Sequence, residues 1–240
     1  MVGARSAAMA FNRLADFPFD VRNPRTSGRA LVKGIVSKTY VAAFVITSSL
    51  VFVFAASRLN RLALELSPAA LAVVFFYSYT KRFTWWTHLF LGASLACAPI
   101  GAWVAVRGSI SAAPLILGLA VALWTAGFDV IYACQDIEFD RSEPLHSVPK
   151  RFGIAWALWV SALLHLAMIV LLAFLLWKEG LGALSLCGLA VVAALLCYEH
   201  SLVKPSDLSR ANTAFFAVNG WISVLLFVVT TVDLLLHKSV

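Results

Sequence analysis

Long apolar runs alternate with short polar, charged segments along most of the chain. In order, the apolar runs cover residues 37–57, 66–79, 87–106, 112–124, 154–177, 181–198 and 211–236. A helix needs about 20 apolar residues to span a bilayer, and several runs reach that length. Two runs are short, but we expect the one that starts at Ala112 to continue as a helix through Tyr132. The pattern predicts an all-α, multi-span transmembrane helical bundle with seven full spans.

An acidic stretch, AFNRLADFPFD at residues 10–20, precedes the first apolar run. Asn12 and Asp16 are four residues apart, so they stack on one helix face, and Asp20 follows four residues later. Pro18 removes a backbone hydrogen bond and is expected to end or kink the helix near Phe17. We therefore place Asn12 and Asp16 on a partial N-terminal helix and Asp20 just past its end.

The partial helix is short for a membrane span. The eleven residues before Asn12 reach about 17 Å as a helix, roughly half the thickness of a bilayer. We therefore expect this helix to be cut, with membrane sequence missing upstream. The start of the chain, MVGARSAAMA, has no long apolar core or cleavage site, so it does not match a signal peptide.

A second acidic stretch, TAGFDVIYACQDIEFDR at residues 125–141, directly follows the apolar run that starts at Ala112. Offsets of +7 and +11 from Asp129 reach Asp136 and Asp140, and at about 100° per residue both return to within roughly 20° of the start. The three carboxylates are thus predicted to share one helix face. Charges at membrane depth cost roughly 2.5–3.5 kcal/mol each, so this face needs a polar cavity or a cation. Carboxylate oxygens suit Mg²⁺.

The basic residues divide unevenly between the two sides of the predicted bundle. One side holds Arg5, Arg13, Arg22, Arg25, Arg29, Lys33, Lys38, Lys81, Arg82, Arg141, Lys150, Arg151, Lys204 and Arg210, and the other holds Arg58, Arg61, Arg107, Lys178 and Lys238. By the positive-inside rule the richer side is cytoplasmic. Both acidic stretches fall on that side, although the charge count did not require it.

Composition agrees with a membrane protein. The chain has 240 residues, of which 61% are hydrophobic and 13% charged, and its mean hydropathy is +0.87, which is too apolar for a soluble domain of this size. The net charge of +7 is mostly explained by topology, with anionic lipid or phosphate as secondary partners. There is no nucleic-acid signature. The four cysteines form no C-x-x-C pair, so they suggest neither a zinc site nor a disulfide framework.

Two basic loops accompany the acidic stretches. Residues 21–34, VRNPRTSGRALVKG, hold four basic residues in fourteen, and Arg22 and Arg25 are the candidates there for meeting a diphosphate. In YSYTKRFT, at residues 77–84, Lys81 and Arg82 place an ammonium beside a guanidinium, which suits phosphate oxygens. The alternative for each basic residue is topogenic charge at the membrane surface.

Other polar residues support more than one interpretation. Glu138 and Glu143 lie off the aspartate face, so we expect them to be solvated. His146 is either a proton acceptor or a bystander, and His165, within a span, is expected to pack or form hydrogen bonds. Asn212 and Asn219 are seven residues apart on the last span, where they either line a cavity or bond neighbouring helices.

Two acidic clusters at the cytoplasmic ends of different helices, beside basic loops and an apolar bundle, indicate metal-bridged binding of an amphiphile with a diphosphate head and a long hydrocarbon tail. NRLADFPFD resembles the first aspartate-rich motif of the UbiA superfamily of intramembrane prenyltransferases, and DVIYACQDIEFD resembles the second. YSYTKRFT matches the family's loop tyrosine and lysine at Tyr77 and Lys81. The resemblance covers essentially the whole chain as a single domain, residues 1–240.

The family fold has nine transmembrane helices around a central cavity, so the resemblance implies that the first helix is missing and the second is truncated. It also implies Mg²⁺-dependent transfer from polyprenyl diphosphate. Asp16 and Asp20, with Asn12 in support, would hold one ion, and Asp136 and Asp140, with Asp129, would hold the other. The set implied to bind the diphosphate or act in catalysis comprises Asn12, Arg22, Arg25, Tyr77, Lys81, Arg82, Asp129, Tyr132, Asp136 and Asp140.

Within the family, YEHSLVKPSDLSRANTAFFAVNG and EPLHSVPKRFG are most similar to the 4-hydroxybenzoate polyprenyltransferase-like branch. The implied acceptor is an aromatic carboxylic acid, either 4-hydroxybenzoate for ubiquinone or 1,4-dihydroxy-6-naphthoate for menaquinone. The implied location is a bacterial inner membrane with the site facing the cytoplasm. Alternatives are another UbiA-type acceptor (haem, a chlorophyll precursor or a glycerophosphate lipid) and a cation-coupled membrane carrier, a class whose charges often lie near the bilayer midplane.

Overall fold

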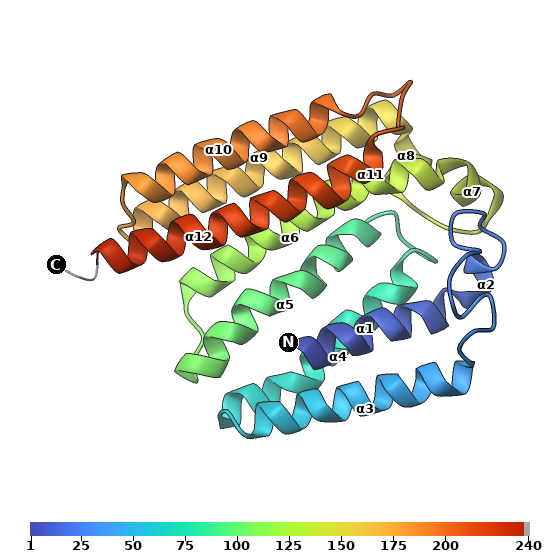
Figure 1. Cartoon of the computed structure of the whole chain (residues 1–240), viewed down its shortest axis with the longest axis horizontal. Helices are drawn as coiled ribbons and strands as arrows, with labels where there is room; N and C mark the ends of the chain where they lie inside the picture. Colours follow the sequence, from blue (N-terminus) through green and yellow to red (C-terminus); the bar gives the residue numbers. More distant parts are fainter. Residues whose placement is uncertain (238–240) are drawn as a thin grey trace.

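The computed structural model describes residues 1–237, and the regular structure of that part is helical (Figure 1). Within these residues, seven helical segments are long and apolar enough to cross a membrane, which confirms the predicted spans: α3 (Lys38–Ser57), α4 (Arg61–Thr80), α5 (Thr87–Arg107), α6 (Ala112–Ala133, with its continuation to Ser142), α9 (Ile154–Lys178), α10 (Ala183–Ser201) and α12 (Asn219–His237, with the turns before it from Ala211). Lys238, assigned above to the sparsely basic side, lies outside the described residues.

Both short apolar runs belong to longer helices. α4 begins at Arg61 because the side chain of Asn60 caps its first turn, accepting from the backbone N of Ala63 at 2.8 Å. α6 continues past Trp124 to Ala133, as expected, and is 22 residues long. Residues 61–65, which lie outside the apolar run, therefore complete α4, and the predicted continuation of α6 is confirmed.

Consecutive long helices pack side by side, from α1 (Val2–Ala15) and α3 through α4, α5, α6, α9 and α10 to α12. Figure 1 shows α1, α3 and α4 on one side of α5 and α6, with α9, α10 and α12 on the other. The short helices α2 (Phe17–Asp20), α7 (Ile137–Ser142) and α8 (Val148–Phe152) lie together at one end. That end carries both acidic stretches.

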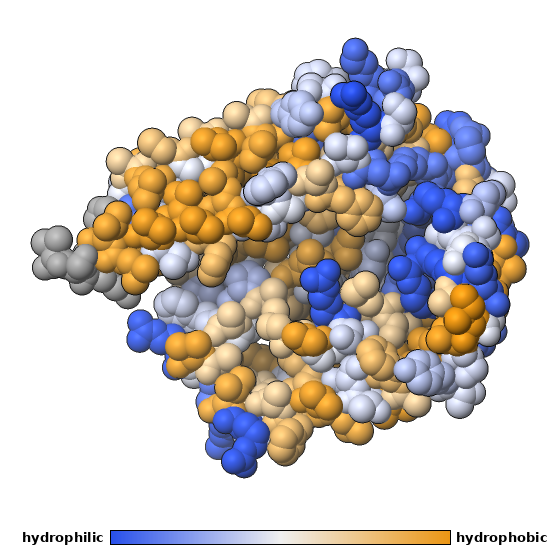
Figure 2. All heavy atoms as spheres, in the orientation of Figure 1, coloured by the Kyte–Doolittle hydropathy of each residue, from blue (hydrophilic) through white to orange (hydrophobic). Residues whose placement is uncertain are grey.

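Small residues let the central helices approach closely. A Cβ built on Gly92 of α5 would collide with the carbonyl of Ala122 in α6, and one on Gly127 of α6 would collide with the ring of His165 in α9. Contacts of this kind are a common way for membrane helices to associate, since lipid is as apolar as their side chains. Outward apolar side chains are exposed along the spans, and Figure 2 shows them as orange surfaces, with blue polar side chains gathered at the end that holds α2 and α7.

The first acidic stretch departs from its predicted placement. α1 ends at Ala15, so Asp16 is the residue after the helix rather than part of it. Asp20 does not lie in a loop but closes the single turn of α2, in which Pro18 occupies one of the first two positions. Proline is tolerated there because the first backbone N–H groups of a helix have no helical partner. The predicted end of the helix near Phe17 is thus confirmed, but a new helical turn that contains Pro18 begins after one residue.

The second acidic stretch is not a continuous α-helix. A 3₁₀ turn, Cys134–Asp136, separates α6 from α7. A 3₁₀ turn advances about 120° per residue rather than 100°, so the regular stripe predicted for Asp129, Asp136 and Asp140 is wrong in detail. All three still contact the N-terminal part of the chain: their partners include His88, Arg25 and Lys81 respectively.

The last span begins irregularly. α11 (Ala211–Thr213) is followed by a π-helical turn, Ala214–Val218, before α12 begins at Asn219. The wider turn breaks the seven-residue register, so Asn212 and Asn219 do not share the predicted face. Asn212 is exposed, whereas Asn219 is buried and hydrogen-bonds to Trp124 of α6 and Glu199 of α10. For Asn219 the interpretation as a link between helices is confirmed.

Candidate active site

The loop after α2 connects the two acidic stretches. Arg25 forms a two-point ion pair with Asp136, with its Nε 2.8 Å from Oδ1, and Asn23 donates to the same oxygen at 3.3 Å. Four residues further on, Arg29 pairs with Asp20. One loop therefore binds a carboxylate from each stretch, which brings both to the same end of the bundle.

Three of the acidic side chains are buried and matched with cations. Asp20, Asp136 and Asp140 are 6%, 7% and 0% exposed. Lys81 Nζ lies 2.7 Å from Oδ1 of Asp140, an ion pair that lacks hydrogen-bond geometry, while Ser147 donates to Oδ2 at 2.7 Å. Buried charges are costly unless paired. The ion pair with a basic residue thus compensates the cost of burying each of these carboxylates. The same basic residue could also bind a negatively charged ligand.

Asp16 is stabilised differently. Asn12 donates to its Oδ2 at 2.9 Å and approaches Ser78 of α4 at 3.4 Å. Burial, and secondly the charge of neighbouring Asp20, raise the pKa of Asp16 to about 6. A carboxylate that is hard to ionise beside a second carboxylate is a place where a cation would be favourable. Lys81 lies close enough to partly offset this effect.

Asp129 lies deeper along α6 and bonds to a histidine. Its Oδ2 is 2.7 Å from Nδ1 of His88 in α5. Tyr77 of α4 lies within electrostatic reach of both Asp129 and Asp16. Tyr132, one turn from Asp136, accepts a hydrogen bond from Arg25 at 2.6 Å, and the guanidinium lies over its ring, 4.8 Å from the centroid.

The two remaining predicted phosphate ligands lie at the rim. Arg82 donates to the backbone carbonyl of Ala15 at 2.6 Å and lies over the rings of Phe19 and Tyr79. Arg22 pairs with Glu143 at 3.0 Å. The expectation that Glu143 is solvated is therefore wrong, since 11% of its side chain is exposed, whereas Glu138 is solvated as expected with 82% exposed.

Several site residues were not singled out from the sequence: Asn23, Arg29, His88, Ser147 and Lys150. Lys150 donates to the backbone carbonyls of Asp140 and Glu143 at 2.6 and 2.9 Å, which satisfies the end of α7. Arg29 belongs to the basic loop already noted, so its charge was visible but its partner was not. His165, expected to pack or bond, is buried between His200 and the carbonyl of Trp124.

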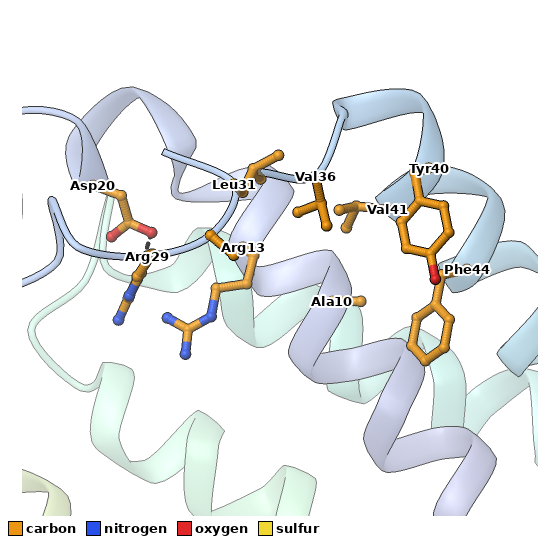
Figure 3. Close-up of a pocket in the computed structure, with 10 residues that line it drawn as sticks. Ala10, Arg13, Asp20, Arg29, Leu31, Val36, Tyr40, Val41 and Phe44 are labelled. Atoms are coloured by element: carbon orange, nitrogen blue, oxygen red, sulfur yellow. Dashed lines mark hydrogen bonds and ion pairs between the residues drawn. The ribbon is translucent and has the colours of Figure 1, made fainter. Parts of the chain in front are cut away.

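A cavity of about 320 Å³ lies against the first acidic stretch, between α1, the following loop and α3. Figure 3 shows Asp20 and Arg29 joined at one end, with Arg13 near them, and Tyr40 and Phe44 of α3 at the other. Ala10, Leu31, Val36 and Val41 make the rest of the wall apolar. A polar end beside an apolar wall has the character of an amphiphile site.

Fold and site together define an integral membrane protein of the all-α type with a charged site at one end of its spans. Comparison of the chain with known protein families specifies the class of protein further. The model of the UbiA prenyltransferase family matches residues 1–227. The chain belongs to the UbiA prenyltransferase family and is a prenyltransferase.

Curated relatives and solved structures agree with this assignment. The chain is 33% identical over 220 residues to a protein of Nitrosococcus oceani named 4-hydroxybenzoate octaprenyltransferase, covering 89% of this chain and 77% of that one. It is 31% identical to the protein of that name from Pseudomonas aeruginosa, covering 95% and 77%. An apo structure of a UbiA homologue from Aeropyrum pernix matches with a TM-score of 0.89 and 35% identity, covering 97% of this chain and 86% of that one. A digeranylgeranylglyceryl phosphate synthase structure, 17% identical with a TM-score of 0.72, covers 96% and 81% and supports the fold.

Proposed function

We propose that this protein transfers a polyprenyl group from polyprenyl diphosphate to a ring carbon of an aromatic carboxylic acid, either 4-hydroxybenzoate or 1,4-dihydroxy-6-naphthoate. The observation that carries the proposal is the convergence of two acidic stretches at one end of an apolar bundle, where Arg29 pairs with Asp20 of the first stretch and Arg25 of the same loop pairs with Asp136 of the second. The names of the curated relatives support 4-hydroxybenzoate as the first acceptor to test.

The donor set suits Mg²⁺, which commonly binds through one or two carboxylates and takes other ligands from water and phosphate. Among residues 1–237 no group of three or more histidine, cysteine or acidic side chains is close enough to hold a metal alone. Asp16 and Asp20 would hold one ion and Asp136 and Asp140 the other, completed by the diphosphate. When bound, Mg²⁺ supplies positive charge to the departing oxygens and so lowers the barrier to C–O cleavage.

The basic residues have two successive partners in this proposal. Without substrate, Arg25, Arg29 and Lys81 neutralise Asp136, Asp20 and Asp140. When a diphosphate binds, the same side chains are available to its oxygens, with Arg82 and Arg22 at the rim. The guanidinium of Arg25 suits phosphate because its planar fork can donate two parallel hydrogen bonds.

Aromatic side chains next to Arg25 would shield the reactive intermediate from water. Ionisation of the allylic diphosphate leaves a carbocation that water would quench, and attack by the ring carbon followed by loss of the ring proton restores aromaticity. Phe128, Tyr132 and Phe215 form a continuous set of ring contacts below Arg25, with centroids 5.2 and 4.3 Å apart. Such an aromatic wall excludes water and offers π faces to a cation.

The alternatives differ in testable ways. Another UbiA-type acceptor, such as haem, a chlorophyll precursor or a glycerophosphate lipid, would use the same diphosphate site. A cation-coupled carrier is less favoured, since its charges would be expected near the bilayer midplane, whereas the acids here gather at helix ends.

The test is an assay of the purified protein in nanodiscs with polyprenyl diphosphate, Mg²⁺ and each acid in turn. We expect a prenylated acid with at least one of them, and none when EDTA replaces Mg²⁺. Product with a different acceptor, but with neither acid, would reject the acceptor and retain the transfer. Release of no diphosphate with any acceptor would reject the function.

We propose that the site faces the cytoplasm of a bacterial inner membrane. With both acidic stretches inside, the seven spans place the end of α12 outside. Alkaline phosphatase fused after Val240 should therefore be active in cells, because the enzyme matures only after export. An inactive fusion, together with a fluorescent GFP fusion at the same position, would contradict this orientation.

A further inference from the structure

His88 makes two directional contacts at the candidate site. It is the second residue of α5 and is 3% exposed. Its Nδ1 lies 2.7 Å from Oδ2 of Asp129, and its Nε2 lies 3.4 Å from the backbone N of Val148, the first residue of α8. A backbone N–H can only donate, so Nε2 must accept and carries no proton. In this arrangement Nδ1 carries the proton and donates to Asp129, while Nε2 accepts from Val148.

This partner distinguishes Asp129 from the other acids at the site. Asp20, Asp136 and Asp140 each pair with an arginine or lysine, whereas within the described residues the ion pairs of Asp129 include no such cation. Its side chain is 18% exposed, and its Oδ1 makes no hydrogen bond in the described part of the chain. Oδ1 of Asp129 is therefore without a hydrogen-bond partner among the described residues, and His88 sets the orientation of the carboxylate.

Neighbouring contacts hold His88 in turn. Thr87, the preceding residue, shares a hydrogen bond of 2.7 Å with Thr80 at the end of α4, and both are buried. This bond closes the loop that carries Lys81. On the other side, Val148 follows Ser147, which donates to Asp140. His88 thus ties Asp129 to both segments that position Asp140.

We propose that His88, donating from Nδ1, is a positioning residue that fixes the carboxylate of Asp129 for prenyl transfer. This inference rests on the proposed function. Outer partners that orient functional groups typically contribute 10- to 100-fold when removed. The chemical requirement is a donor at the place of Nδ1, because the bond to Oδ2 is what selects the orientation of the carboxylate.

Two substitutions separate this role from packing. His88→Phe keeps a ring but loses the donor, and we expect kcat to fall about 10- to 100-fold while KM for the diphosphate changes less than about threefold. His88→Asn places an amide N–H near the position of Nδ1 and should recover kcat to within about fivefold of wild type. Ser94→Ala, on the same helix, is the control for an ordinary substitution, since its hydroxyl donates to the backbone carbonyls of Phe90 at 2.9 Å and of Val73 in α4 at 3.5 Å and not to an acidic residue. Thermal unfolding should be similar in all four proteins.

A kcat within about threefold of wild type in the Phe variant would overturn the proposal. An Asn variant as slow as the Phe variant, with both folded, would do the same. If the Phe variant does not fold, NMR of wild-type protein labelled with ¹⁵N-histidine decides the matter, with the His88 signals identified by their loss in His88→Asn. We expect a protonated Nδ1 and an unprotonated Nε2, and the opposite tautomer would overturn the proposal.

The NMR measurement does not depend on turnover. If wild-type protein transfers no prenyl group but shows the expected tautomer, the proposed function fails and the His88–Asp129 bond stands. If it transfers the group and shows the other tautomer, the function stands and the role of His88 is wrong.

Discussion

Two regions of this molecule that hold buried polar side chains are built in opposite ways. At the end that carries α2 and α7, carboxylates pair with arginine and lysine from loops and helix ends. Between α6, α10 and α12, the indole of Trp124 donates to Asn219 at 2.7 Å, and Asn219 donates to Glu199 at 3.1 Å. No lysine or arginine takes part in these bonds.

The difference between the two regions indicates that the first can bind a ligand, whereas the second holds helices together. A charged pair at a helix end can exchange its partner for a charged ligand, and salt-bridged arginines at such places are suited to phosphate. A hydrogen bond between polar groups inside the bundle joins helices, and in membrane proteins such bonds contribute about 0.6 kcal/mol on average. Polarity alone therefore does not mark a site in a membrane protein, but opposite charges converging from several elements do.

The substitution with the largest expected effect is Asp136→Ala, which tests whether the charged region is the active site. It removes the carboxylate that Arg25 and Asn23 share and one proposed Mg²⁺ ligand. We expect turnover at saturating Mg²⁺ to fall by at least about 100-fold, because charge stabilisation at the leaving oxygens is lost. The measurement is product formation per folded protein, with thermal unfolding as the control. Retention of most of the activity would remove Asp136 from the metal role.

Asn219→Ala tests the other region. The substitution leaves the indole of Trp124 and a carboxylate oxygen of Glu199 without their partner. We expect the free energy of unfolding to fall by about 1–3 kcal/mol, the usual cost of leaving buried polar groups unsatisfied. Turnover of the folded fraction should stay within about threefold of wild type. Lost activity at unchanged stability would instead assign Asn219 to the substrate cavity.

Arg25→Lys sharpens the claim that the loop recognises a diphosphate. Lysine keeps the charge but loses the planar fork that binds both oxygens of Asp136. We expect KM for the prenyl diphosphate to rise about tenfold with a smaller change in KM for the acid. An equal rise for both substrates would indicate general distortion of the loop.

Arg22→Ala should have the smallest effect. Arg22 is 54% exposed and pairs with Glu143 rather than with a proposed metal ligand. Because the guanidinium of this pair is exposed and the pair lies outside the proposed metal ligands, we expect kcat and KM to stay within about twofold of wild type. Steady-state kinetics beside Arg25→Lys gives the comparison directly. A tenfold effect would move Arg22 from the rim into the diphosphate site.

The membrane spans and both acidic stretches could be predicted from the sequence because apolar length and residue spacing act locally. The residues that pair with the acidic side chains could not be predicted. Arg25 and Asp136 are 111 residues apart, and His88 and Asp129 are 41 apart, so their contacts depend on how the helices pack. The 3₁₀ turn at Cys134–Asp136 and the restart of the helix at Pro18 altered the predicted geometry by small local changes in backbone that periodicity does not reveal. Glu143 was misassigned because its partner, Arg22, approaches from a distant loop.

The most direct test of the central claim is whether both acidic stretches bind the same diphosphate. Binding of a non-hydrolysable prenyl thiodiphosphate in the presence of Mg²⁺ would be measured by calorimetry for wild type, Asp16→Asn, Asp136→Asn and the double variant. If both stretches hold one diphosphate, the double variant should lose clearly less affinity than the sum of the single losses, with a coupling of about 0.5–3 kcal/mol. Additive losses, or an effect from only one of the two substitutions, would contradict the account.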